Sequence, residues 1–248
     1  MFLDQNELIE FVENHIGSFH QRRLDRLRLL KMSDLVKRKN PYLFKAKAIT
    51  TAQDFVKFVL DAFLSSQEET IFGEFMEKLA IFVSERTLGG RKSAVEGIDL
   101  ELTKNGIIYL IAIKSGPNWG NSSQIRKMVD NFKKAQRILR TNNQSVQSRC
   151  VNGCCYGKEA QIDKVEYFKI CGQDFWTFIS GDPDLYIDII EPIGHRAREK
   201  NDAFNEEYSR ILNTFTDEFF HQFCQNGLID WQKLVSYSSA SSGRGKLP

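Results

Sequence analysis

An aspartate and a lysine stand on either side of the clearest turn signal in the sequence. Asp99 precedes this turn, Asn105-Gly106 marks its centre, and Lys114 follows it. Asn-Gly between two apolar runs is a strong signal for a β-hairpin. We therefore expect strands over residues 97–102 and 107–113 that bring Asp99 and Lys114 to one end of a sheet. A carboxylate can hold a metal ion and an amine can orient water or phosphate, which is the chemistry of metal-assisted hydrolysis.

The segments around this pair indicate a central sheet with helices on it. The run IIYLIAI at 107–113 is apolar throughout, which is typical of a strand buried on both faces. Residues 121–140 have the periodicity of an amphipathic helix. Between them, SGPNWGNSS predicts a turn whose polar groups could contact phosphate at a helix start. The residues singled out there are Asn118, Asn121 and Ser122.

The rest of the chain predicts further helices and strands. We expect N-terminal helices through residue 32, a loop at 37–47 because Asn40-Pro41 disfavours a helix, and two helices over 51–64 and 65–83. Strands are expected at 146–156, 166–170 and 185–190, and a last helix at 203–223. The pattern favours an α/β fold with a central mixed β-sheet flanked by helices and an N-terminal helical addition.

Composition fits a folded protein of 248 residues with a formal net charge of +2. Basic residues outnumber acidic ones by ten to two over 22–47 and by six to one over 126–140. Such patches bind phosphates, although solvated helix faces would have the same composition. The candidate DNA-binding residues in them are Arg22, Arg23, Arg26, Lys45, Lys133 and Arg137.

The sequence predicts a cytoplasmic protein that does not cross a membrane, because no apolar run is long enough and the N-terminus is acidic. Its five cysteines are expected to be free thiols. A zinc site from Cys150, Cys154, Cys155 and His195 is the less favoured alternative, since CxxxCC lacks paired CxxC spacing.

No linker divides the chain, and we expect one core with additions. The expected division is an N-terminal helical region at 1–64 packed on the core, a core at 65–235 that carries Asp99 and Lys114, and a flexible tail at 236–248. The tail is rich in serine and too poor in apolar groups to order itself.

The stretch from Glu74 to Gln124 resembles the PD-(D/E)XK nuclease superfamily, and in particular type II restriction endonucleases. The resemblance lies in a helix with acidic residues, then GIDLE, the hairpin, and AIKSGPNWGNSSQ. It implies a Mg²⁺ site that uses Asp99 and the backbone carbonyl of Ile113, with Lys114 as a catalytic residue. Gln124, in the first turn of the following helix, would contact Lys114 or a phosphate.

One position departs from the family pattern, because Ala112 stands where the second acid of (D/E)XK belongs. A methyl group cannot bind a metal. Glu101 is the first candidate to replace the acid, since residues two apart on a strand share a face about 6.5 Å apart. Glu77 is the second, because related nucleases direct a helical glutamate into the site, and Glu74 and Glu96 are weaker choices.

The resulting hypothesis is a site-specific type II restriction endonuclease that cuts double-stranded DNA with Mg²⁺ and leaves 5′-phosphate ends. Cutting both strands with one site per chain favours a homodimer. A protective DNA methyltransferase would be its genetic partner. The alternatives are a structure-specific or repair nuclease with the same core, and a non-catalytic DNA-binding module with a vestigial site, which Ala112 suggests.

Overall fold

The computed structural model describes residues 3–142, 144–194 and 197–240. By their contacts, the residues form two compact units. The first contains Met1–Phe19 and Ile71–Ala197, and the second contains His20–Thr70 and Arg198–Pro248. Each unit is described by itself below.

These units do not follow the division expected from the sequence at 64 and 235. Two long helices, α1 (Gln5–Arg28) and α4 (Ala52–Leu88), contribute residues to both units. A continuous helix carries no Pro, Gly or Ser signal where its packing partners change, so composition could not reveal the boundary. Of the expected tail, Ser236–Ser239 belong to α10 (Trp231–Ser239), and residues 241–248 lie outside the described residues.

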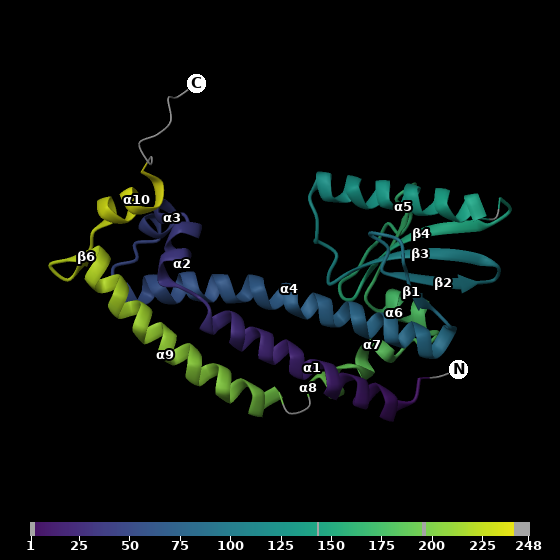
Figure 1. Ribbon diagram of the computed structural model, residues 1–248, viewed down its shortest axis with the longest axis horizontal. Coiled ribbons are helices and arrows are strands. Elements are labelled where there is room, and N and C mark those ends of the chain that lie inside the picture. Colours follow the sequence, from purple (N-terminus) through teal and green to yellow (C-terminus); the bar gives the residue numbers. More distant parts are fainter. Residues whose placement is uncertain (1–2, 143, 195–196, 241–248) are drawn as a thin grey trace, which may run out of the picture. The chain divides into compact units, whose positions relative to one another are not determined.

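The first unit is built on a five-stranded mixed sheet, which confirms the predicted fold class (Figure 1). Its strands lie in chain order, with β1, β2 and β3 antiparallel and with β3, β4 and β5 parallel. The strands are β1 (Arg91–Lys92), β2 (Leu100–Lys104), β3 (Ile107–Lys114), β4 (Gln147–Cys154) and β5 (Phe168–Cys171). The apolar strand β3 is central, as its composition predicted.

The predicted hairpin joins β2 to β3. Asn105 has φ of 51° and Gly106 has φ of 77°, the two positive values that a tight two-residue turn between twisted strands requires. Leu100 pairs with Ile111 and Lys104 with Ile107. The turn therefore sets the register that carries residues 99 and 114 to the opposite end of the hairpin.

Helices cover both faces of the sheet (Figure 1). Helix α5 (Ser122–Asn142) packs on one face, where Phe132 lies against Leu110 and Ala112. On the other face, residues of α1, α4 and α6 (Gln173–Ser180) surround Ile111 and Ile113. The alternation along β3 follows from the two-residue repeat of a strand, and both sets of side chains are buried.

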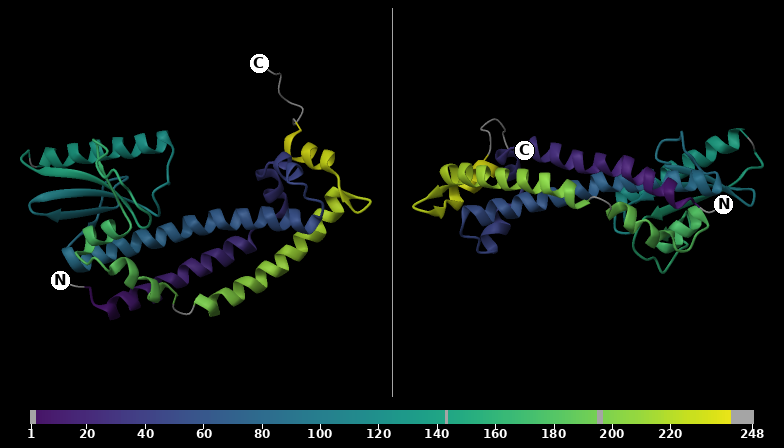
Figure 2. Two further views of the ribbon diagram at one scale, coloured as in Figure 1. Left: turned by 180° about the vertical axis from the view of Figure 1, so that it is seen from behind. Right: turned by 90° about the horizontal axis from the view of Figure 1, so that it is seen from below.

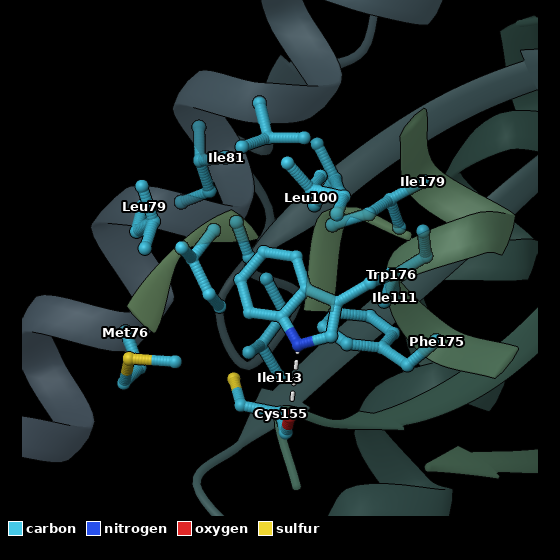
Figure 3. Packing of buried hydrophobic residues seen from close by; sticks show 14 of the residues in the cluster. Met76, Leu79, Ile81, Leu100, Ile111, Ile113, Cys155, Phe175, Trp176 and Ile179 are labelled. Carbon is cyan, nitrogen blue, oxygen red and sulfur yellow. Dashed lines mark hydrogen bonds between the residues drawn. The ribbon is translucent and has the colours of Figure 1, made fainter. Parts of the chain in front are cut away.

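Trp176 is at the centre of the second face (Figure 3). Its ring is buried among apolar side chains of α4, β2 and β3, and its Nε1 donates a 2.8 Å hydrogen bond to the carbonyl oxygen of Cys155. The indole thus fills the core and also satisfies the backbone at the end of β4.

The second unit is helical, apart from a two-stranded hairpin of β6 (Cys224–Gln225) and β7 (Leu228–Ile229). Helix α9 (Ala197–Phe223) and parts of α1 and α4 enclose its core, in which Phe55 stacks on Phe219. Helix α10 packs beside α2 (Met32–Arg38) and α3 (Pro41–Ala46) (Figure 2).

Three local expectations were wrong. Residues 185–190 form short helices, α7 (Leu185–Asp188) and α8 (Ile190–Gly194), instead of a strand, because a short apolar run does not distinguish the two. Asn40-Pro41 begins α3 instead of a loop, with the Asn40 side chain accepting from the Tyr42 amide. Ser65-Ser66 does not interrupt α4, since interior serines cost a helix little.

Among the residues that the structure describes, no helix is long and apolar enough to cross a membrane. The five cysteines are all free thiols, as expected. The zinc alternative includes His195, which lies outside the described residues.

We predict that Trp176→Ala lowers the free energy of unfolding by about 3 to 5 kcal/mol, the usual cost of emptying a large aromatic site. The buried carbonyl of Cys155 would also lose its donor. Urea unfolding followed by far-UV circular dichroism measures the effect. Ile162→Ala, at a side chain that is 42% exposed, is the control and should cost less than about 0.5 kcal/mol. Equal losses in both variants would contradict this account of the core.

Candidate active site

Asp99 lies immediately before β2 and is tied to β3 by two hydrogen bonds. Its backbone amide donates to the carbonyl oxygen of Ile111 at 2.9 Å. Its carboxylate Oδ2 accepts from the backbone amide of Ile113 at 2.6 Å. A carboxylate that accepts from a backbone amide on a rigid strand has a fixed orientation. The described residues place no hydrogen-bond donor on Oδ1, which leaves that oxygen available to a ligand.

Lys114 ends β3 and lies beside this carboxylate. Its Nζ is 4.0 Å from Oδ2 of Asp99 and donates to the carbonyl oxygen of Ile113 at 2.9 Å. The two side chains are 32% and 21% exposed, so both reach solvent from the edge of the core. The hairpin thus brings together the acid and the amine that the sequence singled out.

Glu77 joins this pair from helix α4. Burial raises the pKa of its carboxyl group, and the neighbouring charge of Asp99 raises it further. Lys114 and Lys92 act in the opposite direction, and Glu74 adds a smaller upward effect. Glu77 and Asp99 therefore repel one another when both are ionised.

Glu101 shares a strand face with Asp99, but its carboxylate contacts other groups. Arg91 donates to Oε2 at 2.7 and 3.1 Å, and the Ser93 hydroxyl donates to Oε1 at 2.7 Å. Glu101 is buried, and Arg91 neutralises it across the β1–β2 pair. The weaker candidate Glu96 forms a 3.8 Å ion pair with Lys134. Asp99 and Lys114 thus influence Glu77 electrostatically, whereas Glu101 is paired with Arg91.

Ala112, at the position where the family pattern has its second acid, is inaccessible to solvent. Ala112 is buried against α5, and its strand partner Asn152 is buried beside it. The Asn152 amide donates to the carbonyl oxygen of Ala112 at 3.2 Å and accepts from Nε1 of Trp119 at 3.0 Å. Sequence reasoning gave Asn152 no role. The available signal was a polar residue inside the otherwise apolar strand CVNGCC.

The polar loop and the start of α5 are organised by a capping box. Asn121 Oδ1 accepts from the backbone amides of Ser123 and Gln124, and the Gln124 side chain accepts from the amide of Asn121. This reciprocal pair stabilises the helix N-terminus. Among the described residues, Gln124 therefore caps α5 and forms no hydrogen bond with Lys114, while Asn118 and Ser122 are exposed.

The candidate DNA-binding residues fall in both units. Lys133 and Arg137 are on the exposed side of α5, where Lys133 pairs with Glu166. Arg22, Arg23, Arg26 and Lys45 are in the second unit. Arg23 is held there by Glu68 and Asn201 and lies over the Phe204 ring, whereas Arg26 and Lys45 are exposed. Arg23 thus has a structural role in its own unit.

Within residues 3–142, 144–194 and 197–240, no three or more His, Cys, Asp and Glu side chains gather as a metal-binding group. The donors near Lys114 are two carboxylates, Asp99 and Glu77, and the backbone oxygen of Ile113. These are hard oxygen donors, the kind that Mg²⁺ takes in combination with water and substrate oxygens.

A mixed sheet that holds an acid, a lysine one strand away and a glutamate on the adjoining helix is consistent with the PD-(D/E)XK class of nucleases. The sequence matches the family model described as type II restriction endonuclease EcoO109I over residues 6–201, and the chain belongs to this family of restriction enzymes acting on double-stranded DNA. No curated protein matched the sequence significantly.

We predict that Glu77→Gln stabilises the metal-free protein at pH 7 to 8. The pKa of Glu77 is raised in the folded state, so its ionised form destabilises the fold once the pH exceeds the ordinary value of 4.5. Below that pH the folded and unfolded carboxyl groups are both protonated and the gain should vanish. Chemical unfolding across pH 3.5 to 8 measures it.

Glu85→Gln, at an exposed position of the same helix, is the matched control and should show no such pH dependence. A Glu77→Gln protein that is less stable at pH 8 than at pH 4, relative to wild type, would contradict the burial of an ionised Glu77.

Proposed function

We propose that this restriction endonuclease cuts double-stranded DNA at a specific site with Mg²⁺ and leaves 5′-phosphate and 3′-hydroxyl ends. The supporting observation is the cluster at the end of the β2–β3 hairpin, where Asp99 and Lys114 both contact the backbone of Ile113 and interact electrostatically with Glu77. Membership of the restriction endonuclease family supports hydrolysis of DNA as the reaction of this cluster.

Asp99, the carbonyl oxygen of Ile113 and Glu77 would hold the metal ion. A bound Mg²⁺ polarises the scissile phosphate and favours ionisation of the attacking water. The two acids suit this purpose, because a bound cation would offset the burial and the repulsion from Asp99 that raise the pKa of Glu77. Glu101 is less suitable, since Arg91 already neutralises it.

Lys114 would orient the attacking water and contact a nonbridging phosphate oxygen. Its Nζ lies beside the residues proposed to hold the metal ion, at 2.9 Å from Ile113 O and 4.0 Å from Asp99 Oδ2. The attacking water would lose a proton to solvent as its oxygen bonds to phosphorus, and the bond to the 3′-oxygen would break, so that this oxygen leaves and gains a proton from solvent. An amine fixed in this position contributes by orientation and by charge.

DNA would contact exposed basic and polar side chains of each unit. Lys133, Arg137, Asn118 and Ser122 are exposed in the first unit, and Arg26 and Lys45 are exposed in the second. Arg22 and Asn121 remain candidates, while the engagement of Arg23 with Glu68 and Phe204 argues against a direct phosphate contact.

A homodimer is the proposed acting form, since each chain supplies one site and a duplex has two strands. A DNA methyltransferase of the same specificity is the proposed genetic partner. It would protect the host genome from a nuclease of this kind.

The alternatives are distinguished by one experiment, incubation with phage DNA and Mg²⁺. Discrete fragments support the proposal, and cuts restricted to branched or damaged DNA would support a structure-specific nuclease. Binding without any cut would support a non-catalytic module, the reading that Ala112 suggests.

We predict that Asp99→Ala abolishes this cleavage and leaves specific DNA binding within about threefold of wild type. The change removes a metal ligand and touches no base contact, so the loss should be at least about 100-fold in rate. Gel-shift binding without metal and cleavage with Mg²⁺ provide the two measurements. Normal cleavage by the variant would remove Asp99 from the site.

A second prediction separates the two glutamates. Glu77→Gln should slow single-turnover cleavage by about 100-fold and raise the Mg²⁺ concentration needed for half-maximal rate, because a ligand is lost. Glu101→Gln should leave the Mg²⁺ requirement unchanged and should lower stability instead, since it removes the partner of a charged arginine. The reverse result would make Glu101 the ligand.

A further inference from the structure

Two residues outside the catalytic cluster connect Lys114 to the neighbouring strand. The Nζ of Lys114 lies 5.3 Å from the centre of the Trp119 ring. The indole Nε1 of Trp119 donates to Oδ1 of Asn152 at 3.0 Å. We propose that Trp119, fixed by Asn152, is a positioning residue that holds the Lys114 ammonium group at the reaction centre. This inference rests on the proposed function.

Lys114 needs such a support because its side chain is long and partly exposed. Four rotatable carbons separate its amine from the strand, and holding one geometry costs rotamer entropy. Its hydrogen bond to Ile113 O restrains Nζ from one side. An ammonium group is attracted to the face of an indole within about 6 Å, so the Trp119 ring restrains it from another.

Asn152 in turn determines where the indole lies. It is 1% exposed, and both ends of its amide are paired, with Ala112 O at 3.2 Å and Trp119 Nε1 at 3.0 Å. A buried amide that loses either partner costs free energy, so this pairing is strongly favoured over alternatives. Trp119 therefore has one preferred position.

The alanine at 112 belongs to this arrangement. Ala112 and Asn152 are partners on parallel strands, and their side chains project from the same face of the sheet. The small methyl group leaves room for the amide beside it. Where the family signature has an acid, this chain has Ala112, and the neighbouring Asn152 side chain lies beside it and supports Lys114 through Trp119.

The loop that carries Trp119 is also held from the next strand. Lys169, the β5 partner of Asn152, donates to the carbonyl oxygen of Pro117 at 2.9 Å and forms a 3.1 Å ion pair with Glu159. Gly116 packs so closely on the Tyr156 ring that a Cβ there would lie 2.3 Å from it. The backbone on the N-terminal side of Trp119 is therefore fixed.

The test is a double-mutant cycle measured by single-turnover cleavage of duplex DNA at saturating Mg²⁺. Trp119→Leu should slow cleavage by about 10- to 100-fold with unchanged DNA affinity, the usual effect of a displaced catalytic group. Trp119→Phe keeps a ring and loses the indole donor, so it should fall in between. In a Lys114→Ala background, Trp119→Leu should change the residual nicking rate of supercoiled plasmid by less than about twofold.

Phe58→Leu is the matched control, because it removes a ring that lies at the same 5.3 Å from a lysine, Lys47. It should leave cleavage unchanged. If Trp119→Leu slows cleavage equally with and without Lys114, Trp119 acts by another route and the proposal is overturned while the proposed function stands. If Lys114→Ala alone cuts at the wild-type rate, Lys114 has no catalytic role and the positioning role of Trp119 is overturned, while DNA cleavage itself stands. Wild-type protein that makes no cut would overturn the proposed function.

A measurement on the wild-type protein covers the case in which a Trp119 variant does not fold. Lysines are ¹³C-methylated reductively, and the Lys114 signal is assigned by its loss in Lys114→Arg. Ring currents should move this signal upfield in the metal-free enzyme. A signal at the position of free methylated lysine would overturn the proposal, since the ring would then not be in contact with the amine.

Discussion

The hydrogen bond from the Ile113 amide to the Asp99 carboxylate joins the two strands at the point where the chemistry is expected. It holds Oδ2 of Asp99 against the backbone, and the described residues place no hydrogen-bond donor on Oδ1. The same residue, Ile113, offers its carbonyl oxygen to Lys114. One peptide position in β3 therefore orients both members of the pair, and a shift of register by one residue would point both side chains to the wrong faces.

The cost of this arrangement appears at Glu77. An ionisable group half-buried next to another acid destabilises the folded protein at neutral pH. Lys114 and Lys92 offset only part of that cost. The carboxylate of Glu101, by contrast, accepts hydrogen bonds from Arg91 and Ser93, and the charge of Arg91 neutralises it. Functional sites commonly retain such unrelieved electrostatic strain, whereas structural acids are neutralised within the fold.

Local signals in the sequence predicted the hairpin, the central strand β3 and helix α5, because Asn-Gly turns and apolar periodicity act over a few residues. The sequence placed Asp99 and Lys114 for the same reason. It preferred Glu101 to Glu77 because spacing along a strand is visible and a contact from a helix is not. The helices at Leu185–Asp188 and Ile190–Gly194, and the division into two units, depend on tertiary packing that no short segment encodes.

The anchoring of the loop around Trp119 by β4 and β5 has a consequence for the newly made protein. A nascent chain that has emerged only to residue 146 already contains the β2–β3 hairpin and can bring Asp99 near Lys114. It still lacks Asn152 and Lys169, the residues that contact Trp119 and Pro117. Because synthesis proceeds at about 5 to 20 residues per second, the organised site arises seconds after its acid and amine leave the ribosome. The contacts that fix the loop around Trp119 therefore form only after β4 and β5 have been made.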